Sequence, residues 1–155
     1  MPLNGVRMGD WVCEVDFGAD TAIHAAGDLL ANTEEMLYAV MENGTSVITS
    51  LTLADLDDQG AAIDVLFFRS NPGSLGIRNT PLSITQTQAE ECLGWVPIGA
   101  ADYTDLGTRR VATVRSVGLV VHPTNSTSLW VALVSRGTPT YVTGRLLLKV
   151  GLLRG

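Results

Sequence analysis

Short stretches of alternating apolar and polar residues recur along the chain, and each predicts a β-strand. Residues 9–17 (GDWVCEVDF) set Trp11, Cys13, Val15 and Phe17 on one face and acidic residues on the other, as in a half-buried strand. Similar stretches predict further strands at residues 28–36, 45–55, 61–69, 95–98, 111–122, 128–136 and 145–152. Turn-forming residues separate these stretches, which is typical of antiparallel all-β folds rather than of βαβ folds.

The pattern therefore predicts an all-β fold, an antiparallel β-sandwich of about eight strands with jelly-roll or Greek-key connections. At most one short helix is expected, within residues 83–93, with Ser83 as its cap and Gly94 just past its end. Two β-hairpins are predicted, at residues 45–69 and 111–136, because only turn residues separate their strands. In the first strand of the earlier hairpin, the residues expected to point inward are Val47, Leu51 and Leu53.

Length and composition narrow the class of protein. A chain of 155 residues fits one domain, and 46% hydrophobic residues exclude a disordered chain. The net charge of −6 gives no general attraction to nucleic acid or to anionic membranes. The start of the chain has no signal-peptide pattern, and no apolar run approaches the roughly 20 residues of a membrane span, so production in a cytoplasm is expected.

Only 17% of the residues are charged, and Lys149 is the one lysine, whereas soluble domains are typically about 25% charged. So little charge suggests that part of the surface faces another protein rather than water.

Few residues offer nucleophilic chemistry. His24 and His122 are the two histidines, and no GxSxG motif accompanies them. Cys13 and Cys92 are too few for a disulfide framework and form no CxxC pair. Their spacing does not favour a Cys/His pair either. We therefore expect no catalytic residues and no enzyme activity.

Metal and cofactor motifs are also weak. Residues 55–60 resemble the start of an EF-hand loop, but Leu66 stands where the loop requires glutamate. Calcium at Asp55, Asp57 and Asp58 is an alternative to a solvated turn in which these aspartates cap the backbone. No phosphate-binding loop is present, so no metal site and no cofactor are predicted.

The candidate site residues are therefore interface residues. Residues 130–141 end an apolar strand with a rigid turn in which Arg136 and Tyr141 are suitable anchors, since arginine and tyrosine often anchor interfaces. The alternative for Arg136 is hydrogen bonding to backbone carbonyls at the end of a sandwich. The remaining candidate interface residues are Trp11, Tyr103, Arg109, Arg110 and Trp130. The adjacent pair, Arg109 and Arg110, is expected to form salt bridges rather than to bind phosphate.

Three segments, residues 56–68, 99–118 and 132–141, carry a resemblance to a family of small proteins encoded by tailed bacteriophages and prophages near the major capsid gene. The resemblance extends from about Ile48 to Leu153, roughly two thirds of the chain. It implies a β-sandwich component of the virion, specifically a capsid decoration (cement) protein that stabilises the head by bridging capsomers. Residues 46–155 would form the sandwich, and residues 1–45 a strand or arm region packing on it or reaching a neighbouring subunit.

This resemblance implies the partners as well. They would be the major capsid protein and further copies of the chain, with a trimer favoured over a dimer. The protein would lie on the capsid surface of a virion assembled in the bacterial cytoplasm. The alternative is a receptor-binding or carbohydrate-binding module of a head fibre or tail, which exposed aromatic residues in a shallow groove would support. The aromatic residues available for it are three tyrosines and the tryptophans Trp11, Trp95 and Trp130.

Overall fold

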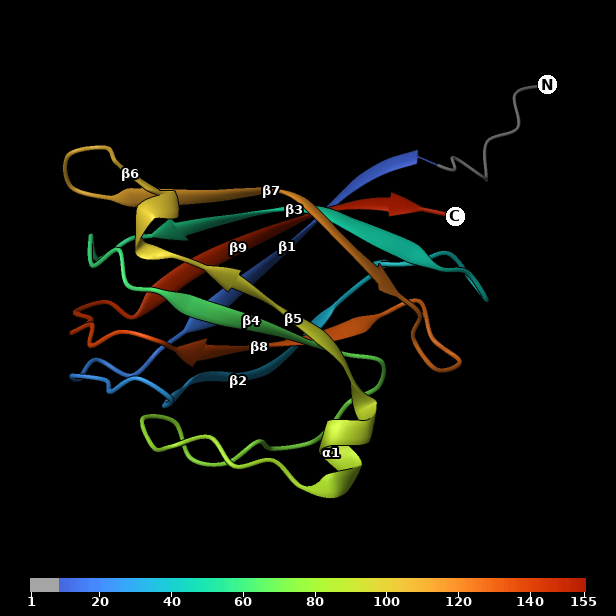
Figure 1. Ribbon diagram of the computed structural model, residues 1–155, viewed down its shortest axis with the longest axis horizontal. Helices are drawn as coiled ribbons and strands as arrows, with labels where there is room; N and C mark the ends of the chain where they lie inside the picture. Colours follow the sequence, from blue (N-terminus) through green and yellow to red (C-terminus); the bar gives the residue numbers. More distant parts are fainter. Residues whose placement is uncertain (1–8) are drawn as a thin grey trace.

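Two β-sheets packed face to face, with one short helix, make up the part of the chain that the computed structural model describes, residues 9–155 (Figure 1). The elements are β1 (Gly9–Gly18), β2 (Leu29–Met36), β3 (Ser46–Asp55), β4 (Ile63–Phe68), α1 (Gln86–Glu91), β5 (Cys92–Ile98), a 3-10 turn (Ala100–Asp102), β6 (Tyr103–Asp105), β7 (Arg110–Val121), β8 (Leu129–Ser135) and β9 (Arg145–Arg154). One sheet has the order β1-β9-β3-β7-β6, and the other has the order β2-β8-β4-β5.

The strands pair as one long hairpin wrapped around itself. β4 pairs with β5 at its tip, and the pairs β3–β7, β2–β8 and β1–β9 follow outward along the hairpin. Wrapping adds the pairs β3–β9 and β4–β8. All of these pairs are antiparallel, and this arrangement is a jelly roll. The predicted all-β antiparallel sandwich is therefore confirmed.

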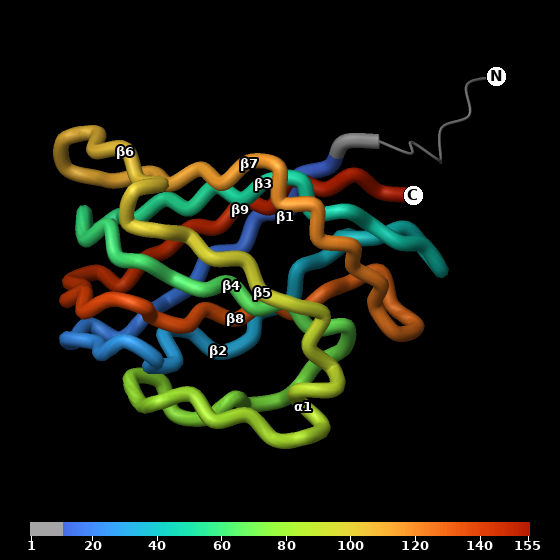
Figure 2. The backbone as a smooth tube through the Cα atoms, in the orientation of Figure 1, coloured from blue at the N-terminus to red at the C-terminus, as the bar shows by residue number. Residues whose placement is uncertain are grey.

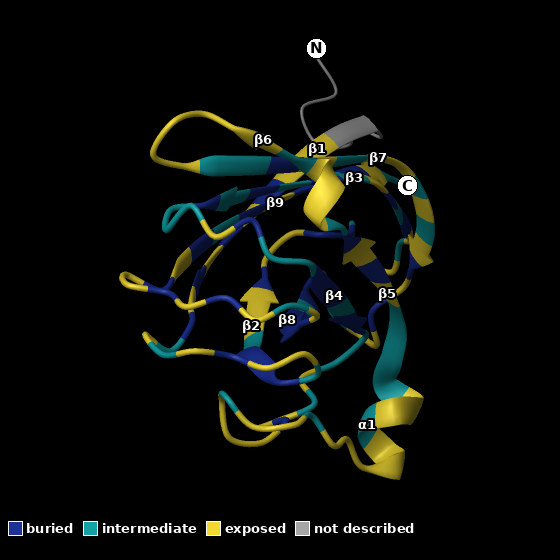
Figure 3. Ribbon diagram, turned by 60° about the vertical axis from the view of Figure 1, so that its left-hand side comes forward, coloured by how far each residue is buried: buried dark blue, intermediate teal, exposed yellow. Residues whose placement is uncertain are grey.

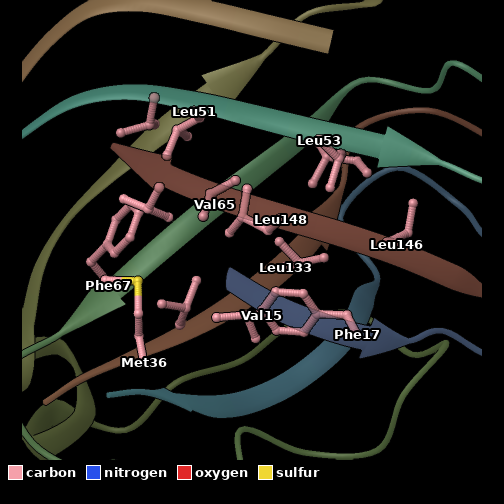
Figure 4. Packing of buried hydrophobic residues seen from close by; sticks show 14 of the residues in the cluster. Val15, Phe17, Met36, Leu51, Leu53, Val65, Phe67, Leu133, Leu146 and Leu148 are labelled. Atoms are coloured by element: carbon pink, nitrogen blue, oxygen red, sulfur yellow. The ribbon is translucent and has the colours of Figure 1, made fainter. Parts of the chain in front are cut away.

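The core fills the space between the two sheets. Every second residue points inward along β9 and, from Leu51 onward, along β3; Leu51, Leu53 and Leu148 are among them and are fully buried. From the other sheet, Val65 and Phe67 of β4 meet them (Figure 4). Burying one such large apolar side chain contributes roughly 1.5–3 kcal/mol, so the alternation in the sequence is what holds the two layers together.

Both predicted hairpins are wrong. β3 lies in the five-stranded sheet and β4 in the four-stranded sheet, and β7 and β8 are separated in the same way. The connection after β3 explains the first error. The buried carboxylate of Asp55 accepts hydrogen bonds from the backbone N–H groups of Asp57, Gln59 and Gly60 at 2.7–3.0 Å. These bonds fix a corner that leads the chain from one sheet to the other.

A β-bulge changes which residues of β3 point inward. Ile48 pairs with Leu152 and Ser50 pairs with Gly151, so Thr49 is an extra residue on β3. A single extra residue reverses the alternation. Ile48 is therefore fully buried, and the expectation that Val47 points inward with Leu51 is wrong.

The short helix is present, with different ends from those expected. Thr85, rather than Ser83, caps α1: its hydroxyl accepts the Gln88 N–H at 3.2 Å, and the Gln88 side chain accepts the Thr85 N–H at 2.9 Å. This reciprocal pair is a capping box. Cys92 already begins β5, so Gly94 is a strand residue and does not end the helix.

The described part of the predicted arm region, residues 9–45, contributes strands to both sheets. β1 pairs with β9 along its whole length, and β2 pairs with β8. Residues 1–8 of that region lie outside the described residues. Contact of residues 1–45 with a neighbouring subunit stays a prediction.

A second carboxylate joins two corners of the sandwich. Asp57 accepts hydrogen bonds from the backbone N–H groups of Val142, Thr143 and Gly144, the shortest at 2.7 Å. Burial raises the pKa of Asp57, but these donors together outweigh it, so its pKa lies below the ordinary value. The ionised form is therefore bound more strongly in the folded protein than in the unfolded chain.

The stability of the fold should consequently depend on the charge of Asp57. A lowered folded-state pKa stabilises the protein above the unfolded-state pKa of about 3.9, and this contribution is lost as the pH falls through the folded-state pKa. Asp57→Asn is expected to lower the free energy of unfolding at pH 7 by about 1 kcal/mol. It should also flatten the decline of stability below pH about 4. Urea unfolding at a series of pH values measures both effects, with the exposed Glu42→Gln as control. An acid dependence identical to that of the parent protein would contradict the prediction.

Candidate functional site

The predicted interface residues lie at separate places in the fold. Trp11, on β1, is 40% exposed, and the guanidinium of Arg154 lies 4.0 Å from the centroid of its ring. This is a cation–π contact at the edge of the five-stranded sheet. A terminal nitrogen of Arg154 also donates to the Tyr38 carbonyl at 3.2 Å. Trp11 is thus an exposed aromatic residue held in place from within the same chain.

Three candidates gather around the β6–β7 hairpin. Arg110 forms an ion pair with Asp58 at 2.9 Å and lies 3.7 Å from Asp105, as expected for a salt-bridged arginine. Arg109 is exposed and donates to the neighbouring carbonyl of Thr108. It forms no ion pair with the described residues, so the expected salt bridge is wrong for Arg109. The third candidate, Tyr103, is half-buried on β6, and its hydroxyl forms a hydrogen bond within the same chain. Tyr103 donates to the Ala61 carbonyl at 2.9 Å, and burial raises its pKa.

Tyr141 is a core residue, so the prediction that it anchors an interface is wrong. Only 2% of it is exposed, and its ring packs edge-on against that of His24, with centroids 5.7 Å apart. Its hydroxyl is buried and has no hydrogen-bond partner among the described residues. Burial, with a smaller contribution from the Asp55 carboxylate, raises the pKa of Tyr141 far above its ordinary value. The rigid turn before it directs the side chain inward.

The residues considered for catalysis have structural partners. His24 is buried, with Nε2 3.0 Å from the Asp20 carbonyl oxygen, and Nδ1 of His122 lies 2.7 Å from the Gly44 carbonyl oxygen. Cys13 is buried and donates to the Leu37 carbonyl. Burial raises the pKa of the Cys13 thiol, which opposes its conversion to the nucleophilic thiolate.

Within residues 9–155, no three His, Cys, Asp or Glu side chains gather as a metal site would require. The three aspartates considered for calcium bind the protein itself. Asp55 and Asp57 accept backbone N–H groups, and Asp58 pairs with Arg110. No helix in the described part of the chain is long and apolar enough to cross a membrane.

The outer face of the five-stranded sheet carries little charge over β3 and β7. In Figure 3 this sheet lies along the top of the molecule, and many residues of its strands are coloured as half-buried or exposed. Outward residues of neighbouring strands pair directly, as Val47 does with Val120, Thr52 with Thr113, and Ala54 with Val111. We call this surface the β3–β7 face. Its members are Val47, Ser50, Thr52, Ala54, Val111, Thr113, Arg115 and Val120.

Arg115 is the one charged member of the β3–β7 face. Other charges on this side of the sheet lie on β9 and β1. Lys149 of β9 is the direct partner of Thr52 and lies 4.0 Å from Glu14, and Arg145 of β9 pairs with Asp16 at 2.9 Å. The free energy needed to remove a weakly polar surface with a single arginine from water is small. The low charge of the sequence is therefore concentrated at a definite surface of the fold, the β3–β7 face.

The four-stranded sheet has a different outer surface. The connection between β4 and β5 crosses it (Figure 1), and Leu75 of this connection is buried against Phe68 and Leu29. Trp130, a predicted interface residue, is half-buried beside this cluster. The connection therefore covers part of the sheet like a third layer.

Beside this cover lies a groove of about 460 Å³, which we call the Trp95 groove. It is lined by Asp64, Leu66, Leu82, Trp95 and Arg136. Trp95 is 59% exposed, and Leu66 is its direct partner across β4 and β5. Arg136, another predicted interface residue, forms an ion pair with Asp64, and its side chain bonds no backbone carbonyl of the described residues. Trp95 was named only for the carbohydrate-binding alternative and was not among the candidate interface residues, although its alternation with inward Val96 and Ile98 places it on the outside.

Comparisons with known proteins give only a distant likeness of fold. No protein-family model and no curated protein matches the chain. Among solved structures, a chain of the cyanophage Pam1 capsid is 14% identical over 100% of this chain and 93% of its own, with a TM-score of 0.36. Desmodium yellow mottle tymovirus is 9% identical over 98% and 84%, with a TM-score of 0.30. Turnip yellow mosaic virus is 10% identical over 98% and 83%, with a TM-score of 0.32. Such likenesses are too distant to say what this chain does.

The buried hydroxyl of Tyr141 gives a test of its place in the core. Tyr141→Phe should be as stable as the parent protein or more stable by about 1 kcal/mol, because it removes a buried polar group without a partner. Tyr141→Ala leaves a cavity and should lower the free energy of unfolding by roughly 3–5 kcal/mol. Urea unfolding measures both variants. A loss of stability of more than about 1 kcal/mol in the Phe variant would show that the hydroxyl is hydrogen-bonded in solution.

Proposed function

We propose that this chain is a structural protein of a bacteriophage virion, and specifically a decoration (cement) protein of the capsid. It binds the outside of the shell and bridges neighbouring capsomers. The observation that carries the proposal is the β3–β7 face, where Arg115 is the only charged side chain at the outward positions of two neighbouring strands within the described residues. The resemblance of residues 48–153 to phage proteins encoded near the major capsid gene supports the same assignment.

The chemistry of the β3–β7 face suits contact with a large protein surface. The central parts of protein interfaces are depleted of charge, because each buried ion must be stripped of water or paired. Little hydration is lost when the short side chains of Thr52, Thr113 and Ala54 are covered. Val120 beside them is an apolar side chain that is 60% exposed. Arg115 supplies one residue of the type that most often anchors an interface.

The proposed partners are the major capsid protein and further copies of the chain. Symmetric binding sites on a capsid lattice favour dimers or trimers of the chain, and the proposal takes the trimer. The proposal places the protein on the capsid surface of a virion that assembles in the bacterial cytoplasm, and it assigns no catalytic activity to the chain.

A charge placed on the β3–β7 face should prevent binding to the capsid. Thr113→Glu buries an unpaired carboxylate in the proposed interface, and Arg115→Glu reverses its one charge. Each is expected to weaken binding about 100-fold or more, from the few kcal/mol that an unpaired buried charge costs. Co-sedimentation with heads lacking this protein measures the affinity, and release of DNA on heating measures the stabilisation of the head.

Thr87→Glu on α1 is the matched control, since it adds the same charge at an exposed position away from the β3–β7 face. Thermal unfolding of each variant checks that the fold is kept, which the exposure of Thr113 and Arg115 favours. Parent-like binding of both face variants, or an equal loss in the control, would contradict the proposed use of this face. Failure of the parent protein itself to bind or to stabilise the heads would contradict the cement function.

A further inference from the structure

The Trp95 groove combines a flat aromatic wall with an apolar floor. Trp95 is 59% exposed, although a buried tryptophan would bring far more stability. Leu66 and Leu82 line the groove beside it. The volume of about 460 Å³ lies within the range of roughly 300–1,000 Å³ that is typical of sites for small ligands.

Two charged side chains in the groove have hydrogen-bonding capacity to spare. Only 11% of the Asp64 side chain is exposed, and within residues 9–155 only its Oδ2 has a partner, the Nε of Arg136. The other carboxylate oxygen and the two terminal nitrogens of Arg136 make no hydrogen bond to the described residues. The groove therefore offers an acceptor on the nearly buried Asp64 next to donors on the half-exposed Arg136.

The charges of this pair cancel, which argues against an anionic ligand. A phosphate or carboxylate site would need cationic charge that is not already neutralised. Asp64 instead binds Arg136 through Nε alone. This leaves both terminal nitrogens of Arg136 free as donors and one oxygen of Asp64 free as an acceptor. A ligand with both donors and acceptors on neighbouring atoms fits this arrangement.

The position of the groove argues against an extended peptide. The floor is the face of the sheet at β4, whose backbone groups are already paired with β5 on one side and with β8 on the other. A peptide that adds a strand needs an unpaired strand edge, and the face of a strand paired on both sides offers none. Recognition in this groove must therefore come from side chains.

We propose that the Trp95 groove binds a neutral sugar residue of a glycan. The apolar face of the pyranose ring stacks on the indole ring of Trp95. Vicinal hydroxyl groups of the same sugar donate to the free oxygen of Asp64 and accept from the terminal nitrogens of Arg136. This activity goes beyond capsid decoration and does not depend on it, because the groove lies on the sheet opposite the β3–β7 face.

The purified chain can be titrated with methyl glycosides of glucose, galactose, mannose and N-acetylglucosamine, with binding followed by saturation-transfer NMR and calorimetry. At least one should bind with a dissociation constant of about 1 mM, as expected for a single sugar on an open site. Trp95→Ala should weaken that binding about tenfold or more, whereas Trp95→Tyr, which keeps an aromatic face, should retain most of it. Asp64→Asn should also weaken binding, because it replaces one acceptor oxygen by a donor.

Trp11→Ala is the matched control, since it removes a second exposed tryptophan on the other sheet. Thermal unfolding of every variant shows whether the fold is kept. Absence of binding by all four glycosides at 50-fold above about 1 mM would overturn the proposal. Binding that survives Trp95→Ala, or that is lost equally in Trp11→Ala, would overturn it too. Tighter binding of glucose 6-phosphate, or of an apolar decapeptide in place of any sugar, would assign the groove to another class of ligand.

Discussion

The pairing of β9 with two strands at once is the contact on which the rest of the structure depends. In Figure 2 the C-terminal strand lies between the strand nearest the N-terminus and the strand that begins at Ser46. Leu148 of β9 is opposite Val15 on one side and Leu53 on the other, and all three are buried. Without β9, β1 would lose its partner in the sheet, and β3 would become an edge strand. The two ends of the chain are therefore needed together before the wrapped hairpin can close.

The positions of the strands could be predicted from sequence because side-chain alternation reports burial on one face, as in β1 and β9. Their pairing could not. Alternation is a local signal, whereas this jelly roll pairs strands as distant as β1 and β9 and sends successive strands such as β3 and β4 to opposite sheets. The features that decide these turns are hydrogen bonds of single carboxylates. Asp55 holds its own loop, and Asp57 holds residues 142–144, far away in the sequence. The bulge at Thr49 also leaves no signal in the alternation of the sequence. It turns Ile48 inward and Val47 outward, the reverse of what was expected.

The candidate site was predictable as a kind of surface and much less as a set of residues. Low charge in the sequence pointed to a covered face, and the β3–β7 face has that character because threonine, alanine and valine fill its outward positions. Individual anchors depended on tertiary direction instead. Tyr141 follows a rigid turn that sends it into the core, and the Arg110 guanidinium is held by Asp58. The exposure of Trp95 could be predicted from the strand alternation around Val96 alone. Its place in a groove could not, because Asp64 and Arg136 are brought beside it by other strands and loops.

The two proposed surfaces belong to opposite sheets of the sandwich, and this has a consequence for how they could act together. The β3–β7 face is the outer side of the five-stranded sheet, and the Trp95 groove opens on the outer side of the four-stranded sheet. A molecule that lies on a capsid through the first surface would direct the second away from the shell. Many copies on one lattice would then present many weak sites at once, and multivalent attachment can exceed the affinity of a single site by about 10²–10⁴. A dissociation constant of about 1 mM for one sugar would be sufficient for firm attachment of a whole particle, so the weakness of an open groove is compatible with function on a virion.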